Sequence, residues 1–154
     1  MNIETTVSTA MGELALGDTF TFDELVSAVQ RRRERPLRIV ELADLSDRHG
    51  LCALWLERDS ADLVVHAHTE SPLHRQQFVL HELAHMILDH GDNPDLDAPD
   101  QLLPDISVIA RRRLLARHDL DSEAEILAEA LADHLAAAIR GSVTQQSKFV
   151  EIFG

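Results

Sequence analysis

The sequence predicts an α+β fold in which helices pack against a three-stranded, mostly antiparallel sheet. Apolar residues recur at helical spacing in a segment near the N-terminus and in two later segments. Between them lie three short apolar runs rich in β-branched residues and separated by turn-forming residues, as expected of strands. The 154 residues, 45% of them hydrophobic, suit one domain with a substantial core, whereas two domains would be cramped.

The composition indicates which partners the protein can bind and in which cellular compartment it is found. The formal net charge of −13, from 14 basic and 27 acidic residues, argues against a general nucleic-acid binder, because such proteins gain affinity by neutralising phosphates. The single cysteine, Cys52, cannot form an internal disulfide. The N-terminus lacks a signal-peptide pattern, and no apolar run is long enough to span a bilayer. We therefore expect a cytoplasmic protein that contacts neither nucleic acid nor a membrane directly.

The chain is expected to begin with a weakly patterned segment and then a strong helix. Residues 1–20 show little periodicity and predict a flexible arm or a short helix, ahead of a domain that spans 21–141. The helix starts from a cap at Thr21, with Glu24 as its reciprocal partner, and runs to about Glu34. It ends in the basic run 31–35. Positive charges at a helix C-terminus interact favourably with the helix dipole, and we expect these side chains to be solvated.

Three strands are predicted next, at 37–42, 51–57 and 62–68. The turn-forming segments between them are short, and short connections predict an antiparallel meander. Cys52 is expected to be a small sheet residue, because no activating group lies near it in sequence. His66 and His68 alternate with apolar neighbours and are interpreted as ordinary strand residues, with contact to a substrate as the alternative.

The following helix carries the most informative motif of the chain, residues 81–85, which read His-Glu-Leu-Ala-His. Ser71 supplies an N-cap, Pro72 the first helical position and Gly91 a C-terminal stop. Apolar residues cover most of the helix circumference, so the helix is predicted to be buried, with both histidines on the remaining stripe. Buried imidazoles need partners, and this favours metal ligation over purely structural histidines.

The spacing of this motif predicts a zinc site. His81 and His85 lie one turn apart on one helix face, where both can direct a ring nitrogen at one ion. Two imidazoles leave a tetrahedral zinc ion in need of a third protein ligand and an open position for water. Glu82 projects from the flank, where it can take a proton from that water.

The third ligand is expected on the last strong helix, which runs from Ser122 to about Arg140. In a helical projection Glu123 is the one acid within the apolar stripe, whereas Glu125 and Glu129 lie on the opposite side. A buried carboxylate without a partner is costly, and a metal would remove that cost, so Glu123 is predicted as the ligand. Glu129 is the competing candidate, because Asp133 follows it one turn later as a supporting carboxylate would.

The remaining segments carry weaker signals. The acidic, proline-spaced stretch 92–101 is interpreted as a solvated connector, with a flap over a cleft as the alternative. A further helix is predicted from Ile106 to about Arg117. Gly141 is expected to stop the last helix, which leaves a tail, 142–154, that either folds back or meets a partner.

The segments 81–85 and 121–128 resemble the ImmA/IrrE family of bacterial and phage zinc metallopeptidases. That family typically shows a His-Glu-Leu-Gly-His helix and a later Glu-x-Glu-Ala-Asn-x-Phe-Ala helix, and here 121–128 read Asp-Ser-Glu-Ala-Glu-Ile-Leu-Ala. The resemblance covers roughly 21–140 and implies a zincin-like fold. It also implies zinc held by His81, His85 and Glu123, with Glu82 as the catalytic base. The sequence departs from the pattern at Ala84, Glu125 and Leu127, which replace glycine, asparagine and phenylalanine; the spacer between the ligand helices is also longer and acidic.

The same resemblance suggests a biological setting. The lead-in Ser71-Pro72-Leu73-His74 is particularly like that of family members that are toxin components of toxin–antitoxin systems. Family members act on transcriptional repressors that are often encoded alongside, which implies a protein substrate such as a helix-turn-helix repressor. The expected function is therefore a zinc-dependent endopeptidase that cleaves a regulatory protein. The alternative is a zinc-containing binding protein or toxin component that sequesters a partner without proteolysis. The sequence does not specify an oligomeric state.

Overall fold

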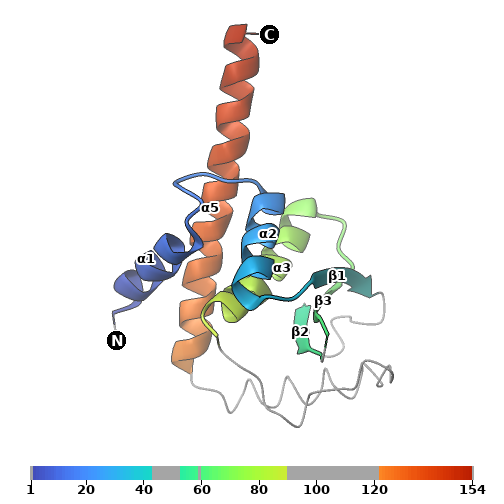
Figure 1. The fold of residues 1–154 in the computed structure, drawn as a ribbon. Coiled ribbons are helices and arrows are strands. Elements are labelled where there is room, and N and C mark those ends of the chain that lie inside the picture. Colours follow the sequence, from blue (N-terminus) through green and yellow to red (C-terminus); the bar gives the residue numbers. More distant parts are fainter. Residues whose placement is uncertain (1, 43–52, 59, 90–121, 154) are drawn as a thin grey trace.

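The computed structural model describes residues 2–42, 53–58, 60–89 and 122–153. Within these residues the fold is α+β, with four helices and a three-stranded mixed sheet (Figure 1). No described helix is both long enough and apolar enough to cross a membrane. Cys52, Gly91, the acidic stretch 92–101 and the helix predicted at 106–117 lie outside the described residues.

The first helix, α1 (Ile3–Leu14), occupies the segment for which a flexible arm or a short helix was predicted. Its N-terminus is capped by the side chain of Asn2, which accepts a hydrogen bond from the backbone N–H of Thr5. Val7, Ala10 and Leu14 are buried at helical spacing and belong to the main core. The segment is therefore a short helix that packs on the fold, the second of the two alternatives that the sequence left open. Small residues between the apolar ones had weakened the periodic signal.

Helix α2 (Phe22–Arg33) begins and ends where the sequence predicted. Thr21 and Glu24 form the predicted capping box, in which each side chain accepts a hydrogen bond of 3.1 Å from the other residue's backbone N–H. The buried face consists of Leu25, Ala28 and Val29.

The sheet contains β1 (Leu37–Leu42), β2 (Ala53–Glu57) and β3 (Asp62–Ala67), and β3 lies in the centre. Strand β3 pairs parallel with β1 and antiparallel with β2. The predicted antiparallel meander is therefore wrong. Four residues, 58–61, lie between β2 and β3, which pair with each other, whereas ten residues, 43–52, lie between β1 and β2, which do not. The most buried strand takes the central position.

The two faces of the sheet enter different clusters. Trp55 and Val64 are register partners and face the helices, as part of the main core. Leu54, Leu56 and Val65, which point the other way, form a second and smaller cluster. Strand β3 ends one residue earlier than predicted, so that His66 is buried within the strand and His68 is exposed beyond it.

A buried ionic cluster joins the end of α2 to the sheet. Asp62 is 1% exposed and accepts hydrogen bonds from Arg33 and from the indole N–H of Trp55. The guanidinium of Arg33 also stacks over the Trp55 ring at 4.7 Å. Burial lowers the pKa of Arg33, but the hydrogen bond and charge of Asp62, with the charge of Glu57, outweigh burial and raise it. Arg33 is therefore a packed residue, unlike the solvated basic run that the sequence predicted.

Helix α3 (Pro72–Ile87) carries the histidine motif and lies between α5 and the sheet. Its N-terminus follows the prediction: the Ser71 side chain accepts a hydrogen bond from the backbone N–H of His74, and Pro72 takes the first helical position. Leu80, Leu83 and Met86 are almost fully buried. The helix is thus held on several sides by apolar contacts.

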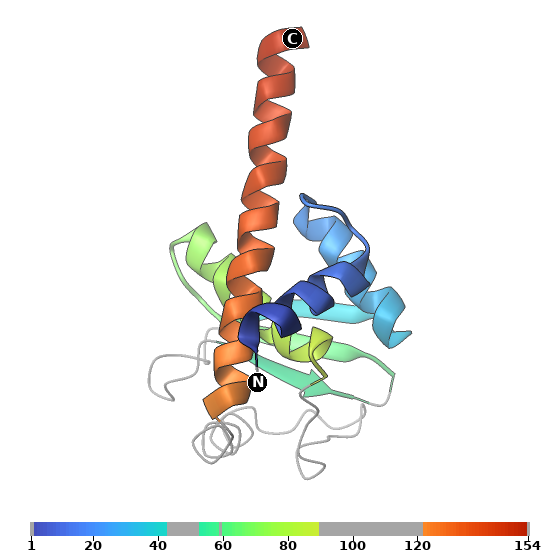
Figure 2. The ribbon, with the colours of Figure 1, turned by 90° about the vertical axis from the view of Figure 1, so that its left-hand side faces the viewer.

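Helix α5 (Ser122–Phe153) is 32 residues long and runs straight through the predicted stop at Gly141. Its C-terminal part extends beyond the other helices and the sheet in both views (Figure 1, Figure 2). The expected separate tail, 142–154, is thus mostly a continuation of this helix. A lone glycine lowers helix stability by about 1 kcal/mol but does not by itself end a helix. Gly141 instead allows a close approach, since a Cβ there would lie 2.8 Å from Cγ2 of Thr19.

Candidate metal centre

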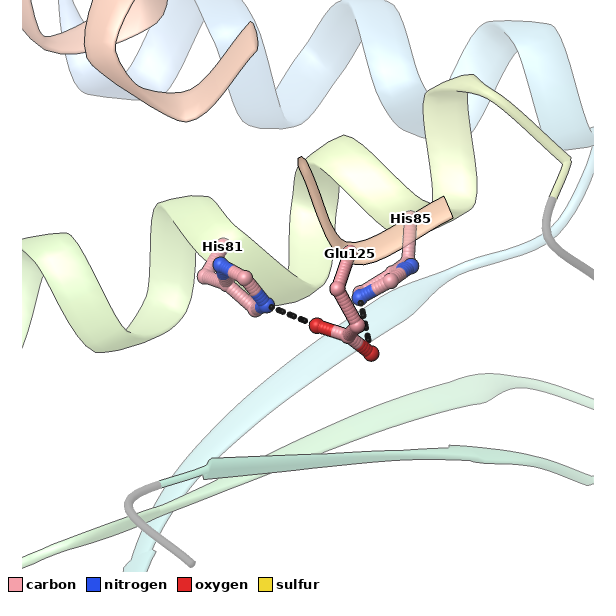
Figure 3. Close-up of side chains that lie close together, drawn as sticks. All are labelled: His81, His85 and Glu125. Atoms are coloured by element: carbon pink, nitrogen blue, oxygen red, sulfur yellow. Dashed lines mark hydrogen bonds and ion pairs between the residues drawn. The ribbon is translucent and has the colours of Figure 1, made fainter. Parts of the chain in front are cut away.

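The motif turn of α3 and the first turn of α5 bring three ligand-type side chains together. Figure 3 shows His81 and His85 projecting from α3 toward the carboxylate of Glu125. Nε2 of His81 lies 3.1 Å from Oε2 of Glu125, and Nε2 of His85 lies 3.4 Å from Oε1 of the same carboxylate. The two imidazole rings have centroids 4.9 Å apart and planes inclined by 77°. Each histidine thus contacts its own oxygen of one carboxylate.

The arrangement can hold a metal ion. One ligand atom from each residue lies within 4.8 Å of the other two. This spacing lets one ligand atom of each residue approach a common ion. Two imidazoles and one carboxylate are also a ligand set of catalytic zinc sites, which keep a fourth position for water. The group can therefore hold a metal ion.

The group is enclosed on one side and open on the other. The side chain of His85 is 7% exposed, whereas those of His81 and Glu125 are 25% and 29% exposed. His85 is thus embedded in protein, and the accessible side of the group is formed by His81 and Glu125. Solvent can reach that side, as an open coordination position requires.

The acid beside the histidine pair is neither of the two candidates from the sequence, Glu123 and Glu129. Among the described residues, the group within ligand distance consists of His81, His85 and Glu125, and it includes neither Glu123 nor Glu129. Glu123 is half-buried and Glu129 is exposed. The acid beside the histidine pair is thus Glu125, two residues after the predicted ligand Glu123 on the same helix.

Glu125 lies beside the histidines because one face of α5 packs into the core and another lies along α3. Leu127, Leu131 and Leu135 direct the apolar stripe of α5 into the core, as the projection predicted. The face that carries Glu125 lies along α3, where Asp133, two turns later, accepts a hydrogen bond of 3.3 Å from Gln77. The sequence held a signal for this, because the polar residues 125, 129 and 133 repeat every four residues, as do 77, 81 and 85 on α3.

Glu82, the predicted general base, lies next to His81 on α3 and is 1% exposed. It is not a member of the ligand group. A carboxylate at this depth is costly unless polar partners surround it. The assignment of Glu82 as a base remains a prediction from the motif.

The end of the motif helix is held from α2. Arg32 donates a hydrogen bond of 3.2 Å to the carbonyl of Ile87, the last residue of α3, and pairs with Glu13 of α1 at 3.1 Å. Carbonyls at a helix C-terminus lack intrahelical partners, and a cation there also favours the helix dipole. Contacts from α2 and α5 therefore fix α3 at its C-terminal end and along its histidine-bearing half.

Comparison with protein-family models, with curated proteins and with solved structures finds no match to this chain. The case for a metal centre therefore rests on the geometry of His81, His85 and Glu125.

Proposed function

We propose that this protein is a zinc-dependent endopeptidase whose metal is held by His81, His85 and Glu125. The observation that supports it most directly is the convergence of two imidazoles and one carboxylate within 4.8 Å, from helices far apart in sequence. The partly exposed side of this group leaves room for water and a substrate. The acidic residue inside the motif, Glu82, completes the set of residue types that such hydrolases use.

The proposed chemistry divides between the metal and the protein. When bound, zinc supplies a Lewis acid that makes water more acidic and polarises a carbonyl. His85, the more buried ligand, and Glu125 orient the site through the packing of α3 and α5. Glu82 serves as general base: its carboxylate takes the proton of the attacking water and returns it to the leaving amine.

The substrate class is proposed from the resemblance to the ImmA/IrrE family. That family acts on transcriptional repressors, so a helix-turn-helix repressor encoded near this protein is the first substrate to test. Glu125 stands where the family usually has asparagine, and the ligand position that the family pattern assigns falls on Glu123. We therefore propose a variant site in which the carboxylate ligand lies two positions later.

Glu82→Gln tests the enzymatic part of the proposal. Purified wild type and variant are loaded with zinc, dialysed, analysed for metal, and incubated with a proteome-derived peptide library whose new N-termini are identified by mass spectrometry. We expect both proteins to retain about one zinc ion per chain, with cleavage by the variant reduced at least about 100-fold. Glu129→Gln, an exposed acid outside the ligand group, is the matched control and should behave as wild type.

The same experiment separates the proposal from its rival. If zinc-loaded wild type produces no new N-termini, from the library or from the neighbouring repressor, the peptidase proposal is wrong. The result would then support the alternative, a metal-containing protein that binds a partner without cleaving it. If Glu82→Gln cleaves at the wild-type rate, Glu82 is not the base.

A further inference from the structure

A second site is present on the opposite side of the motif helix. A pocket of about 250 Å³ lies where the start of α2, the sheet and the first half of α3 meet, with apolar walls from Phe22, Ile39 and Val79. The α3 residues that line it are 72, 75, 76 and 79, which share one helix face. His81 follows Val79 by two positions, about 200° around the helix. The pocket is therefore separate from the metal centre.

The polar groups of this pocket favour an anion. Arg75 and His66 line it, and no Asp or Glu does so among the described residues, although the chain contains 27 acids. The guanidinium of Arg75 is anchored at the rim by a hydrogen bond of 3.4 Å from Nη2 to the carbonyl of Thr69. Its other N–H groups remain available, because a guanidinium has five donors.

His66 gives the pocket a fixed polar wall. It is 5% exposed, and its Nδ1 lies 3.1 Å from the carbonyl oxygen of Ala67. A carbonyl only accepts hydrogen bonds, so Nδ1 of His66 carries a proton and donates to Ala67. Arg75 and His66 thus place a charged and a polar side chain with hydrogen-bonding groups in an otherwise mainly apolar lining.

We propose that this pocket binds a small organic acid with a single apolar or aromatic body. The body would fill the space between Phe22, Ile39 and Val79, and the carboxylate would pair with Arg75 at the rim. The volume of about 250 Å³ lies below that of pockets for drug-sized ligands, which limits the body to about one ring.

The test is a titration of the intact protein with 3-phenylpropionate, followed by amide chemical shifts in two-dimensional NMR. Two comparison compounds separate the parts of the ligand: 3-phenylpropanol keeps the body without the charge, and acetate keeps the charge without the body. We expect saturable shifts that map to the pocket for 3-phenylpropionate, and affinities at least about tenfold weaker for the other two.

Two variants and a matched control assign the site. Arg75→Gln should weaken 3-phenylpropionate binding at least about tenfold, whereas Arg38→Gln, an exposed arginine on the other face of β1, should leave it unchanged. Gln76→Trp, which places a large side chain at the lining, should block binding while the thermal midpoint confirms folding.

Three results would overturn the proposal. These are no saturation up to about 20 mM 3-phenylpropionate, equal weakening by Arg75→Gln and Arg38→Gln, or undiminished binding in folded Gln76→Trp. Because the pocket and the metal centre lie on opposite sides of α3, this outcome is independent of whether the protein binds zinc.

Discussion

Glu125 and His81 are 44 positions apart in the chain, yet Oε2 of one lies 3.1 Å from Nε2 of the other. This contact joins the first turn of α5 to the motif turn of α3, so the candidate metal centre exists only when the two helices are packed. Metal binding and folding should therefore be linked, because an ion that binds the native state alone stabilises it.

Zinc is accordingly expected to raise the thermal midpoint. A free concentration about 100 times the dissociation constant stabilises the native state by about 2.7 kcal/mol, which for a chain of this size corresponds to a shift of roughly 5–10 °C. Calorimetry with zinc, with excess EDTA and with magnesium as a control would measure it. Identical midpoints in zinc and EDTA would contradict the link.

Replacement of Arg33 tests the ionic cluster. Arg33→Gln removes the closer of the two arginines that pair with Asp62, which is 1% exposed, and should lower the free energy of unfolding by about 3 kcal/mol. The matched control is Arg31→Gln, two residues earlier on an exposed position of α2, which should change it by less than about 0.5 kcal/mol. Urea denaturation measures both. Equal effects would show that the cluster does not stabilise the fold.

His68 is expected to titrate above its ordinary pKa of 6.5, because its protonated ring donates hydrogen bonds to two carboxylates. Hydrogen bonds with Glu70 and then with Glu41 raise this pKa. Since the folded-state pKa is the higher one, the stabilisation is complete below pH 6.5 and disappears as the pH rises through the folded value. An NMR titration should show the pKa falling in Glu70→Gln and Glu41→Gln. It should not move in Glu4→Gln, an acid on α1.

The contact between Gly141 and Thr19 is testable by a double-mutant cycle. Alanine normally stabilises a helix relative to glycine by about 1 kcal/mol, but its Cβ would lie 2.8 Å from Cγ2 of Thr19. Gly141→Ala should therefore fail to stabilise wild type, yet stabilise Thr19→Ser by up to about 1 kcal/mol. Serine removes Cγ2 and keeps the hydroxyl that donates to Gln145. Equal effects in both backgrounds would refute the close approach.

The sequence predicted those features that depend on neighbours within a few residues. Thr21 with Glu24, and Ser71 with Pro72, mark helix starts because capping involves backbone groups only two or three positions away. Strand β1 was placed at its observed bounds for the same reason, since a short apolar run with β-branched residues is a local signal.

Features that depend on distant neighbours were missed. The residue types within β1 and β3 are compatible with parallel and with antiparallel pairing, so they could not reveal the parallel pair. Gly141 resembled a helix stop because the residues next to it in sequence give no sign of its contact with Thr19. That residue lies in the loop between α1 and α2. In each case the deciding contact comes from another part of the chain.

Glu125 was missed for a more specific reason. A helical projection ranks faces by burial, and it therefore selected Glu123, the acid nearest to the apolar stripe. A metal ligand at an accessible site lies instead at the border between the apolar and polar faces, and the Glu125 side chain is 29% exposed. The burial argument thus located the helix but not the position on it.

We propose that Glu125, rather than Glu123, completes the metal centre with His81 and His85. The most direct test is zinc affinity by competition with a chromophoric chelator, for wild type, Glu125→Ala and Glu123→Ala, with circular dichroism to confirm folding. We predict that Glu125→Ala weakens zinc binding at least about 100-fold, while Glu123→Ala stays within about threefold of wild type. Unchanged affinity in Glu125→Ala, or the larger loss in Glu123→Ala, would contradict the assignment.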